Sequence, residues 1–195
     1  MPLSRRDLAP EPLAQFRRWL EEARPLERAA EAMALATATA DGRPSVRMVL
    51  MKQADEAGLV FFTHTTSRKG EELAANARAA LLFHWDALGR QVRVEGSVSP
   101  VSGTEADRDW VTRPPGARLA ALASPQSRVV ESREALEARV AELAAAGEPR
   151  RPPTWGGYRL VPEVWEFWQH RENRLHDRFR YRGDGASWAV ERLGP

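Results

Sequence analysis

The sequence predicts an α+β fold that is mainly β, an antiparallel barrel with peripheral helices. Roughly seven to nine short β-favouring segments are separated by turn residues, and about four helical segments lie among them without regular βαβ alternation. The chain has 195 residues, 43% of them hydrophobic and 29% charged, so it is long enough to bury one substantial core. We therefore expect residues 1–195 to form a single domain.

The N-terminal segment, residues 1–30, is expected to be helical. Pro12 suits a first helical turn, and Phe16 and Leu20 then recur at helical spacing. This spacing predicts an amphipathic helix over residues 10–23 that packs on the body of the protein.

A strand hairpin and a third strand are expected next. The segments 33–39 and 45–52 flank Asp41-Gly42, a dipeptide typical of hairpin turns, although the alanines of the first segment also permit a helix. Segment 58–64 is too apolar for an exposed strand, so we expect it inside the sheet.

A basic helix start follows this strand. Ser67 is a candidate N-cap for a helix over residues 67–76, and Arg68 and Lys69 stand in its first turn. A helix N-terminus offers unpaired N–H groups and the positive end of the helix dipole. The segment therefore predicts a phosphate site, although a helix that merely begins with basic residues remains an equal alternative at this point.

The remaining chain alternates between strands and helices. Further strands are expected over residues 79–85, 91–99, 157–161, 164–168, 175–181 and 187–192. Helices are expected over residues 104–111, over 117–123, and over a segment that Ser132 caps and Gly147 ends. In the last of these, Leu136, Val140 and Leu143 form one apolar stripe.

The segment RLHDR near the C-terminus groups cationic and titratable side chains. On a strand, Arg174, His176 and Arg178 would share one face, with the outer two about 13 Å apart. Trp165 and Trp168 add flat apolar surface nearby, a combination suited to a charged aromatic ligand. A solvated strand face is the alternative.

Composition excludes several classes of function. The chain has no cysteine, which excludes disulfides and thiolate metal sites, and its 4 histidines show no metal-binding spacing, so we expect no metal. No apolar run reaches the length of a membrane span and the N-terminus lacks a signal peptide, so we expect a cytoplasmic protein. The formal net charge of only +2 argues against nucleic-acid binding.

No GxSxG, P-loop or GxGxxG motif is present, and no carboxylate pair suggests acid–base catalysis. A chain rich in cationic donors and poor in nucleophiles suits a phosphorylated cofactor that carries out the chemistry itself. The cationic clusters comprise Arg47 with Lys52, Arg68 with Lys69, and Arg174, His176 and Arg178.

Six motifs in series resemble the pyridoxine (pyridoxamine) 5′-phosphate oxidase family. They are RMVLMK (47–52), VFFTHTTSRKG (60–70), RQVRVEG (90–96), SPQS (124–127), WGGYRLVP (155–162) and EFWQHRENRLHDRFRY (166–181). The resemblance covers nearly the whole chain and keeps the same order.

This resemblance implies an FMN-binding split β-barrel that works as a homodimer, with two FMN sites at the subunit interface and residues 155–195 carrying substrate and dimer contacts. Matched by position, the FMN-binding residues would be Arg47, Met48, Val49, Leu50, Met51, Lys52, Phe62, Thr63, Arg68, Lys69, Gln91, Gln126, Ser127, Trp168 and Arg178.

The resemblance also implies a reaction and a substrate site. Arg174 and His176, the catalytic candidates, would contact the pyridine ring together with Leu175, while Lys52 and Arg113 would bind the substrate phosphate. The substrate would be pyridoxine 5′-phosphate or pyridoxamine 5′-phosphate, the product pyridoxal 5′-phosphate. Molecular oxygen would accept the electrons and form hydrogen peroxide.

The chain departs from the family at the phosphate site. Asp109 and Ala117 stand where these oxidases usually have a tyrosine and a serine, and a carboxylate beside a phosphate is repulsive. Two alternatives therefore stay open: a flavin oxidase of phenazine biosynthesis acting on an unphosphorylated dihydrophenazine carboxylate, and a non-catalytic flavin-binding split barrel.

Overall fold

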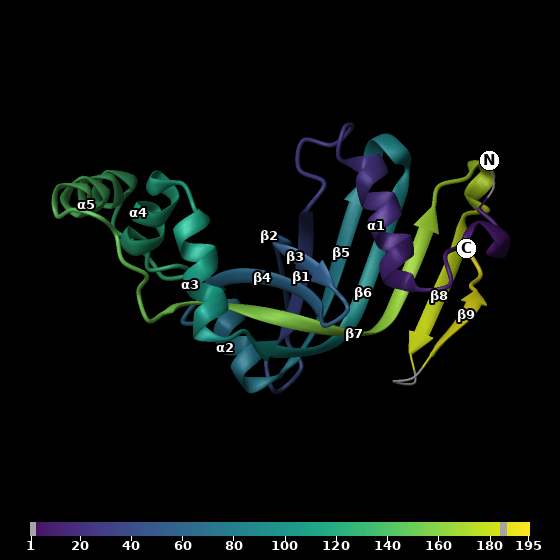
Figure 1. The fold of residues 1–195 in the computed structure, drawn as a ribbon. Coiled ribbons are helices and arrows are strands. Elements are labelled where there is room, and N and C mark those ends of the chain that lie inside the picture. Colours follow the sequence, from purple (N-terminus) through teal and green to yellow (C-terminus); the bar gives the residue numbers. More distant parts are fainter. Residues whose placement is uncertain (1–2, 184–186) are drawn as a thin grey trace.

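The described chain forms one antiparallel sheet that curls on itself, with helices at its rim (Figure 1). The computed structural model describes residues 3–183 and 187–195. The strands are β1 (Ala32–Ala38), β2 (Pro44–Leu50), β3 (Gln53–Asp55), β4 (Gly58–His64), β5 (Arg78–Trp85), β6 (Arg90–Pro100), β7 (Trp155–Gln169), β8 (Asp177–Gly183) and β9 (Trp188–Arg192). The helices are α1 (Pro12–Ala23), α2 (Arg68–Ala75), α3 (Gly103–Thr112), α4 (Pro115–Ala123) and α5 (Arg133–Ala145), with the 3₁₀ turns η1 (Arg5–Asp7), η2 (Asp86–Leu88) and η3 (Glu172–Arg174).

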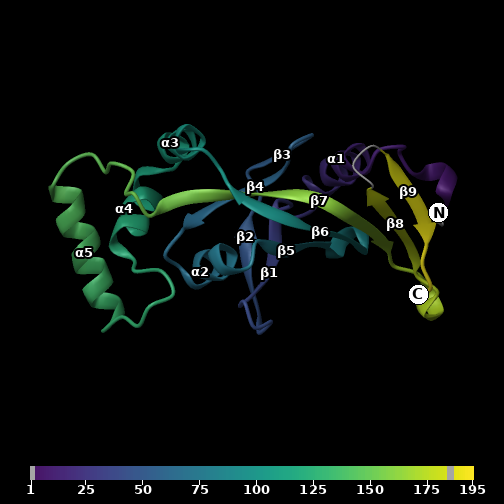
Figure 2. The same ribbon diagram turned by 90° about the horizontal axis from the view of Figure 1, so that it is seen from below.

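The strand order explains how the two ends of the molecule arise. The main path runs β2-β1-β5-β6-β7-β4-β3, and β8 pairs with β7 and with β9 beyond this path. Strand β7 is long enough to pair with β4 and β8 in turn, so it runs along the molecule from the α3–α4 end to the C-terminal hairpin (Figure 2). The expected mainly antiparallel barrel with peripheral helices is confirmed.

The expected break between strands 157–161 and 164–168 is wrong, because both belong to β7. Pro162 pairs with Gly96 and Val164 with Glu95, so Glu163 is an extra residue on β7, and the strand continues through this shift in register. A Cβ atom on Gly96 would lie 1.9 Å from the carbonyl oxygen of Val161, so only glycine lets the two backbones approach this closely.

Helix α1 closes the core, as its apolar spacing predicted. Phe16 is fully buried, and its ring centroid lies 4.9 Å from that of Phe83, 6.1 Å from Trp85 and 5.4 Å from Trp165. These three partners come from β5 and β7, so one helical side chain ties two strands together. The β1–β2 hairpin, β4 and α2 were likewise predicted correctly, whereas β3 was missed.

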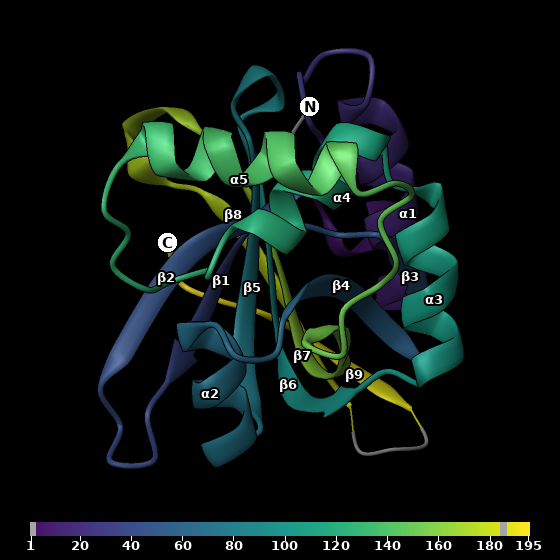
Figure 3. The ribbon, with the colours of Figure 1, turned by 90° about the vertical axis from the view of Figure 1, so that its left-hand side faces the viewer.

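Helices α4 and α5 lie against each other at the end of the molecule opposite β8 and β9 (Figures 1 and 3). The apolar stripe of α5, comprising Leu136, Val140 and Leu143, is only half-buried, and neither helix has a buried residue. The predicted N-cap is confirmed, since Ser132 Oγ accepts the backbone N–H of Ala135 at 3.1 Å. Among the described residues, no helix is long and apolar enough to cross a membrane.

The packing of α1 makes a prediction for stability. We expect Phe16→Ala to lower the free energy of unfolding by about 3–5 kcal/mol, because it removes a fully buried ring and leaves a cavity. Leu26→Ala, at a side chain that is 56% exposed just after this helix, should change it by less than about 0.5 kcal/mol. Urea unfolding at one protein concentration measures both; equal losses would mean that Phe16 does not anchor the core.

Candidate functional site

A cavity of about 440 Å³, which we call the Lys69 pocket, opens beside β2, β4 and α2. Cationic and polar side chains line it, and none of its lining residues is acidic. It is lined by Arg47, Met48, Val49, Leu50, Lys52, Phe62, Thr63, Lys69, Arg113, Gln126, Ser127 and Trp155. Eleven of these twelve are predicted site residues, so most of the residues expected to contact a cofactor or a phosphate are brought together here.

Lys69 lies at the buried wall of this pocket and is only 6% exposed. Its Nζ donates to Thr63 Oγ1 at 3.0 Å, Ser67 Oγ at 3.1 Å and Gln126 Oε1 at 2.8 Å. Burial, and then the charge of Arg47, lower the pKa of Lys69 to about 8. All three acceptors are neutral oxygens, so the ammonium charge itself has no direct ion pair among them.

Strain in the backbone marks one edge of the pocket. Ser127 has a φ of 70°, a left-handed conformation uncommon for a residue other than glycine. Gln126, beside it, accepts hydrogen bonds from both Thr63 (2.9 Å) and Lys69 (2.8 Å). Its amide thereby ties the segment after α4 to β4 and α2. Strained residues of this kind cluster at functional sites.

Asp109 does not line the Lys69 pocket, although its position in the sequence predicted a carboxylate beside the substrate phosphate. Its carboxylate is buried and accepts the indole N–H of Trp155 at 3.2 Å. The guanidinium of Arg113 lies over the same indole ring, 4.2 Å from its centroid. Arg113 Nε is buried without a hydrogen-bond partner among the described residues. The lining of the Lys69 pocket therefore includes Arg113, whereas the carboxylate of Asp109 is bonded to Trp155 and is not part of the lining.

A second, smaller cavity of about 240 Å³, the Trp168 pocket, lies over β6, β7 and β8. Gln91 is paired with Trp168 across β6 and β7, and Trp168 with Arg178 across β7 and β8. Arg178 Nε donates to Glu166 Oε1 at 2.8 Å, and Arg93 Nη2 donates to Glu166 Oε2 at 2.7 Å. The pairing of neighbouring strands thus brings these three predicted residues together.

A third cavity, the His176 pocket, shares Trp168 with the second and includes Arg174. The ring of His176 lies 4.6 Å from that of Trp168 and 5.3 Å from that of His170. The backbone N–H of Arg171 donates to His176 Nδ1 at 3.1 Å, so a neutral His176 carries its proton on Nε2.

The expected strand face of Arg174, His176 and Arg178 is wrong, because β8 begins only at Asp177. Arg174 lies in η3 with a φ of 61°, and Asn173 before it has a φ of 55°. Two successive left-handed residues bend the chain before the strand starts, so the first three residues of RLHDR lie outside β8.

Some predicted residues lie elsewhere. Met51 is 6% exposed and belongs to the hydrophobic core, and Leu175 is 70% exposed and does not line the three cavities. Arg68 is also outside the Lys69 pocket lining but is joined to Arg47 through Glu72. No site role was predicted for Trp155, His170, Arg93, Glu166 or Glu72. The first four lie within the motifs WGGYRLVP, EFWQHRENRLHDRFRY and RQVRVEG, so the sequence carried a signal for them, whereas Glu72 lies outside all six motifs.

The Lys69 pocket has no lining residue in common with the Trp168 and His176 pockets. The predicted site residues of one chain are therefore divided between two places. In the described part of the chain, no group of three or more histidine, aspartate or glutamate side chains could hold a metal ion.

Comparison with known families accounts for nearly the whole chain. Residues 20–146 match the family described as pyridoxamine 5′-phosphate oxidase, and residues 155–195 match the family described as pyridoxine 5′-phosphate oxidase C-terminal dimerisation region. The chain belongs to the pyridoxine/pyridoxamine 5′-phosphate oxidase family. The resemblance carried by the six motifs is thereby confirmed.

Curated members of this oxidase family are similar along their full length. The pyridoxine/pyridoxamine 5′-phosphate oxidase of Cupriavidus taiwanensis is 55% identical over 197 residues, covering 99% of this chain and 93% of the relative. That of Ralstonia pickettii is 56% identical over 194 residues, covering 97% and 91%.

Solved structures share the fold. PhzG from Burkholderia lata 383, crystallised with tetrahydrophenazine-1-carboxylic acid, is 41% identical with a TM-score of 0.92, covering 97% of this chain and 95% of that one. A pyridoxamine 5′-phosphate oxidase-related, FMN-binding protein from Nostoc punctiforme is 20% identical with a TM-score of 0.76, and the match covers 100% of both chains. This second likeness confirms the split-barrel fold.

Proposed function

We propose that this protein is an FMN-dependent oxidase of a single domain that converts pyridoxine 5′-phosphate or pyridoxamine 5′-phosphate to pyridoxal 5′-phosphate. The observation that carries the proposal is the Lys69 pocket, whose lining contains four cationic side chains and no acidic one. Arg47, Lys52, Lys69 and Arg113 offer enough positive charge for two phosphate groups, one on the cofactor and one on the substrate.

The donor set of the pocket fits FMN. Arg47 and Lys69 would hold its phosphate, Lys69 bringing a buried ammonium that has only neutral acceptors. Phe62 and the backbone of β2 would border the ring system. When bound, FMN supplies the two-electron acceptor that the side chains of this protein lack.

A second copy of the chain would complete each site. The Trp168 and His176 pockets, which carry Gln91, Trp168, Arg178, Arg174 and His176, share no lining residue with the Lys69 pocket. The relation of residues 155–195 to a dimerisation region supports a homodimer that brings these parts together.

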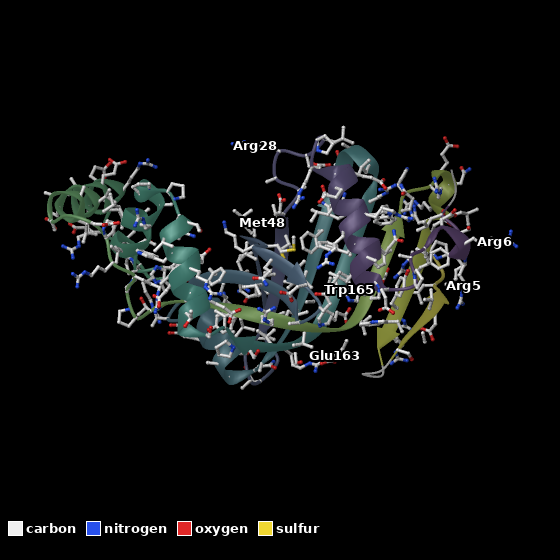
Figure 4. All side chains as sticks on the ribbon, viewed as in Figure 1. Arg5, Arg6, Arg28, Met48, Glu163 and Trp165 are labelled. Carbon is white, nitrogen blue, oxygen red and sulfur yellow. The ribbon has the colours of Figure 1, made fainter. Side chains whose placement is uncertain are left out.

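The β2 edge has the character of a surface covered by this second copy. Val46, Met48 and Leu50 are 69%, 65% and 50% exposed along one face of the strand, and Met48 is labelled in Figure 4. Contiguous exposed apolar residues of this size mark an interaction surface more often than free solvent-facing strand.

In the proposed reaction the protein orients the substrate and neutralises the charge of its phosphate group. Lys52 and Arg113 bind the substrate phosphate, and Arg174 and His176 hold the pyridine ring against the flavin, with His176 Nε2–H as a donor. The alcohol group of pyridoxine 5′-phosphate loses two electrons and two protons to become an aldehyde, while oxygen is reduced to hydrogen peroxide. The amine substrate additionally consumes water and releases ammonia.

Two observations support the alternative of an unphosphorylated phenazine substrate: the similarity to PhzG, and Ala117 at the position where the family usually has a serine. Asp109 does not favour it, because this carboxylate is engaged by Trp155 and does not line the pocket. Lys52 and Arg113 remain unopposed there, which favours a phosphorylated substrate.

Anaerobic reduction tests the proposal. The FMN-loaded protein is mixed with pyridoxine 5′-phosphate without oxygen, and we expect the visible absorbance of oxidised flavin to disappear and to return in air with one hydrogen peroxide per cycle. Bleaching with a dihydrophenazine carboxylate but not with pyridoxine 5′-phosphate would favour the phenazine alternative. Absence of flavin binding would contradict both.

Arg174→Ala separates the substrate site from the cofactor site. We expect FMN affinity to change little and kcat/KM to fall about 10–100-fold, the loss typical of a charge-assisted hydrogen bond. Arg182→Ala, at an exposed arginine of β8, should leave both unchanged. Full turnover by Arg174→Ala would remove this residue from the substrate site.

The lowered pKa of Lys69 predicts a pH dependence for FMN binding. Below its pKa of about 8 the ammonium is already charged, so binding takes up no proton; above it, binding the phosphate dianion must protonate Lys69. Because the phosphate itself takes up a proton near pH 6, FMN affinity should be flat between about pH 7 and 8 and fall up to about tenfold per unit above pH 8. Flavin fluorescence titrations between pH 7 and 9 measure this, and Lys69→Arg should flatten the profile. A flat wild-type profile would contradict the role of Lys69.

A further inference from the structure

Glu72 on α2 is a buried carboxylate, 4% exposed, that the proposed reaction does not use. Its Oε2 accepts the hydroxyls of Thr37 on β1 and Ser45 on β2, both at 2.5 Å, and Nη2 of Arg47 at 3.2 Å. Its Oε1 accepts Nε of Arg68 at 2.8 Å. One carboxylate thus connects two strands and a helix with two predicted FMN-binding arginines.

The hydroxyl groups of Thr37 and Ser45 also bind Arg47 directly. Thr37 Oγ1 accepts Nη1 of Arg47 at 2.5 Å, and Ser45 Oγ accepts Nη2. A hydroxyl has a single proton, so donating it to Glu72 turns the oxygen lone pairs toward the guanidinium. The carbonyl oxygen of Leu35 accepts Nη1 at 3.2 Å as well. Glu72 therefore fixes the direction of Arg47 both directly and through the two hydroxyls.

Glu72 also sets the charge of the cluster. Arg47, Arg68 and Lys69 carry three positive charges, and one carboxylate reduces their sum to +2. A phosphate monoester carries about −1.5 to −2 near pH 7, so the cluster matches it. Burial by itself raises the pKa of Glu72, but hydrogen bonds from Ser45, Thr37 and the two arginines outweigh it and lower the pKa to about 2. The negative charge is therefore present throughout the physiological range.

We propose that Glu72 is the positioning residue of the FMN phosphate site: without touching FMN, it orients Arg47 and Arg68 toward the phosphate and balances the charge of the cluster. The proposal rests on the assignment of FMN to the Lys69 pocket. It predicts that Glu72 acts on the phosphate end of the cofactor and not on the flavin ring.

Comparing FMN with riboflavin isolates the phosphate, because riboflavin has the same ring and lacks only that group. The FMN-free protein is titrated with each, and quenching of flavin fluorescence gives the dissociation constants. Glu72→Gln keeps the shape but loses the charge and one acceptor oxygen, so we expect FMN affinity to fall about 10–100-fold and riboflavin affinity by less than about threefold.

A matched control stands one residue earlier on the same helix. Glu71 pairs with Arg128 on the surface, with its side chain 52% exposed, and Glu71→Gln should leave both affinities unchanged. In Glu72→Gln the decline of FMN affinity with pH should also begin below pH 8, because the charge of Glu72 raises the pKa of Lys69. A role confined to packing would not move this profile.

A third variant keeps the test decisive if Glu72→Gln fails to fold. Glu72→Asp retains the charge but is one methylene shorter and cannot reach both arginines. The FMN affinity of Glu72→Asp should therefore lie between those of the wild type and Glu72→Gln. If Glu72→Gln is unfolded, the affinity of Glu72→Asp should still lie below that of the wild type. Equal losses for FMN and riboflavin, or no loss for FMN in either variant, would overturn the proposal while leaving the FMN assignment intact. A wild-type protein that binds riboflavin as tightly as FMN, or that binds neither ligand, would overturn both the role of Glu72 and the assignment of FMN to the Lys69 pocket.

Discussion

The structure depends on the buried positive charge of Lys69. Among the described residues, no acidic side chain forms a direct ion pair with this ammonium group. Lys69 is 6% exposed, and its ammonium bonds only to oxygens of Thr63, Ser67 and Gln126. Burying a cation in this way is costly unless an anion joins it, and the lowered pKa expresses that cost. Glu72, the carboxylate nearby, is engaged with Arg47 and Arg68. We therefore propose that a phosphate group of the cofactor supplies the missing negative charge.

The second constraint is the length of β7. This strand pairs with β4 near its start and with β8 near its end, so it separates the cationic pocket beside β4 from the aromatic pockets beside β8. We propose that one chain carries complementary parts of a site rather than a whole one. The proposed homodimer would resolve this separation, since two-fold symmetry would place the same pair of parts together twice.

Much of this arrangement could be predicted from the sequence. Local signals sufficed for α1, the β1–β2 hairpin and α2, and the six motifs identified nearly all residues of the Lys69 pocket. Contacts between distant residues could not be predicted: Asp109 turning to Trp155 depends on packing across 46 positions. The left-handed Asn173 and Arg174 were also missed, because the pattern of charges alone resembles a strand.

The measurement that tests the two-copy site most directly is complementation within one dimer. Lys69→Met disables the cationic pocket and Arg174→Ala disables the His176 pocket; the two variants are co-expressed with different affinity tags, and the mixed dimer is isolated. If each site uses both copies, one of the two sites keeps both intact parts, and the mixed dimer should show about half of wild-type turnover. Turnover no higher than that of the parent variants would mean that each site belongs to one chain.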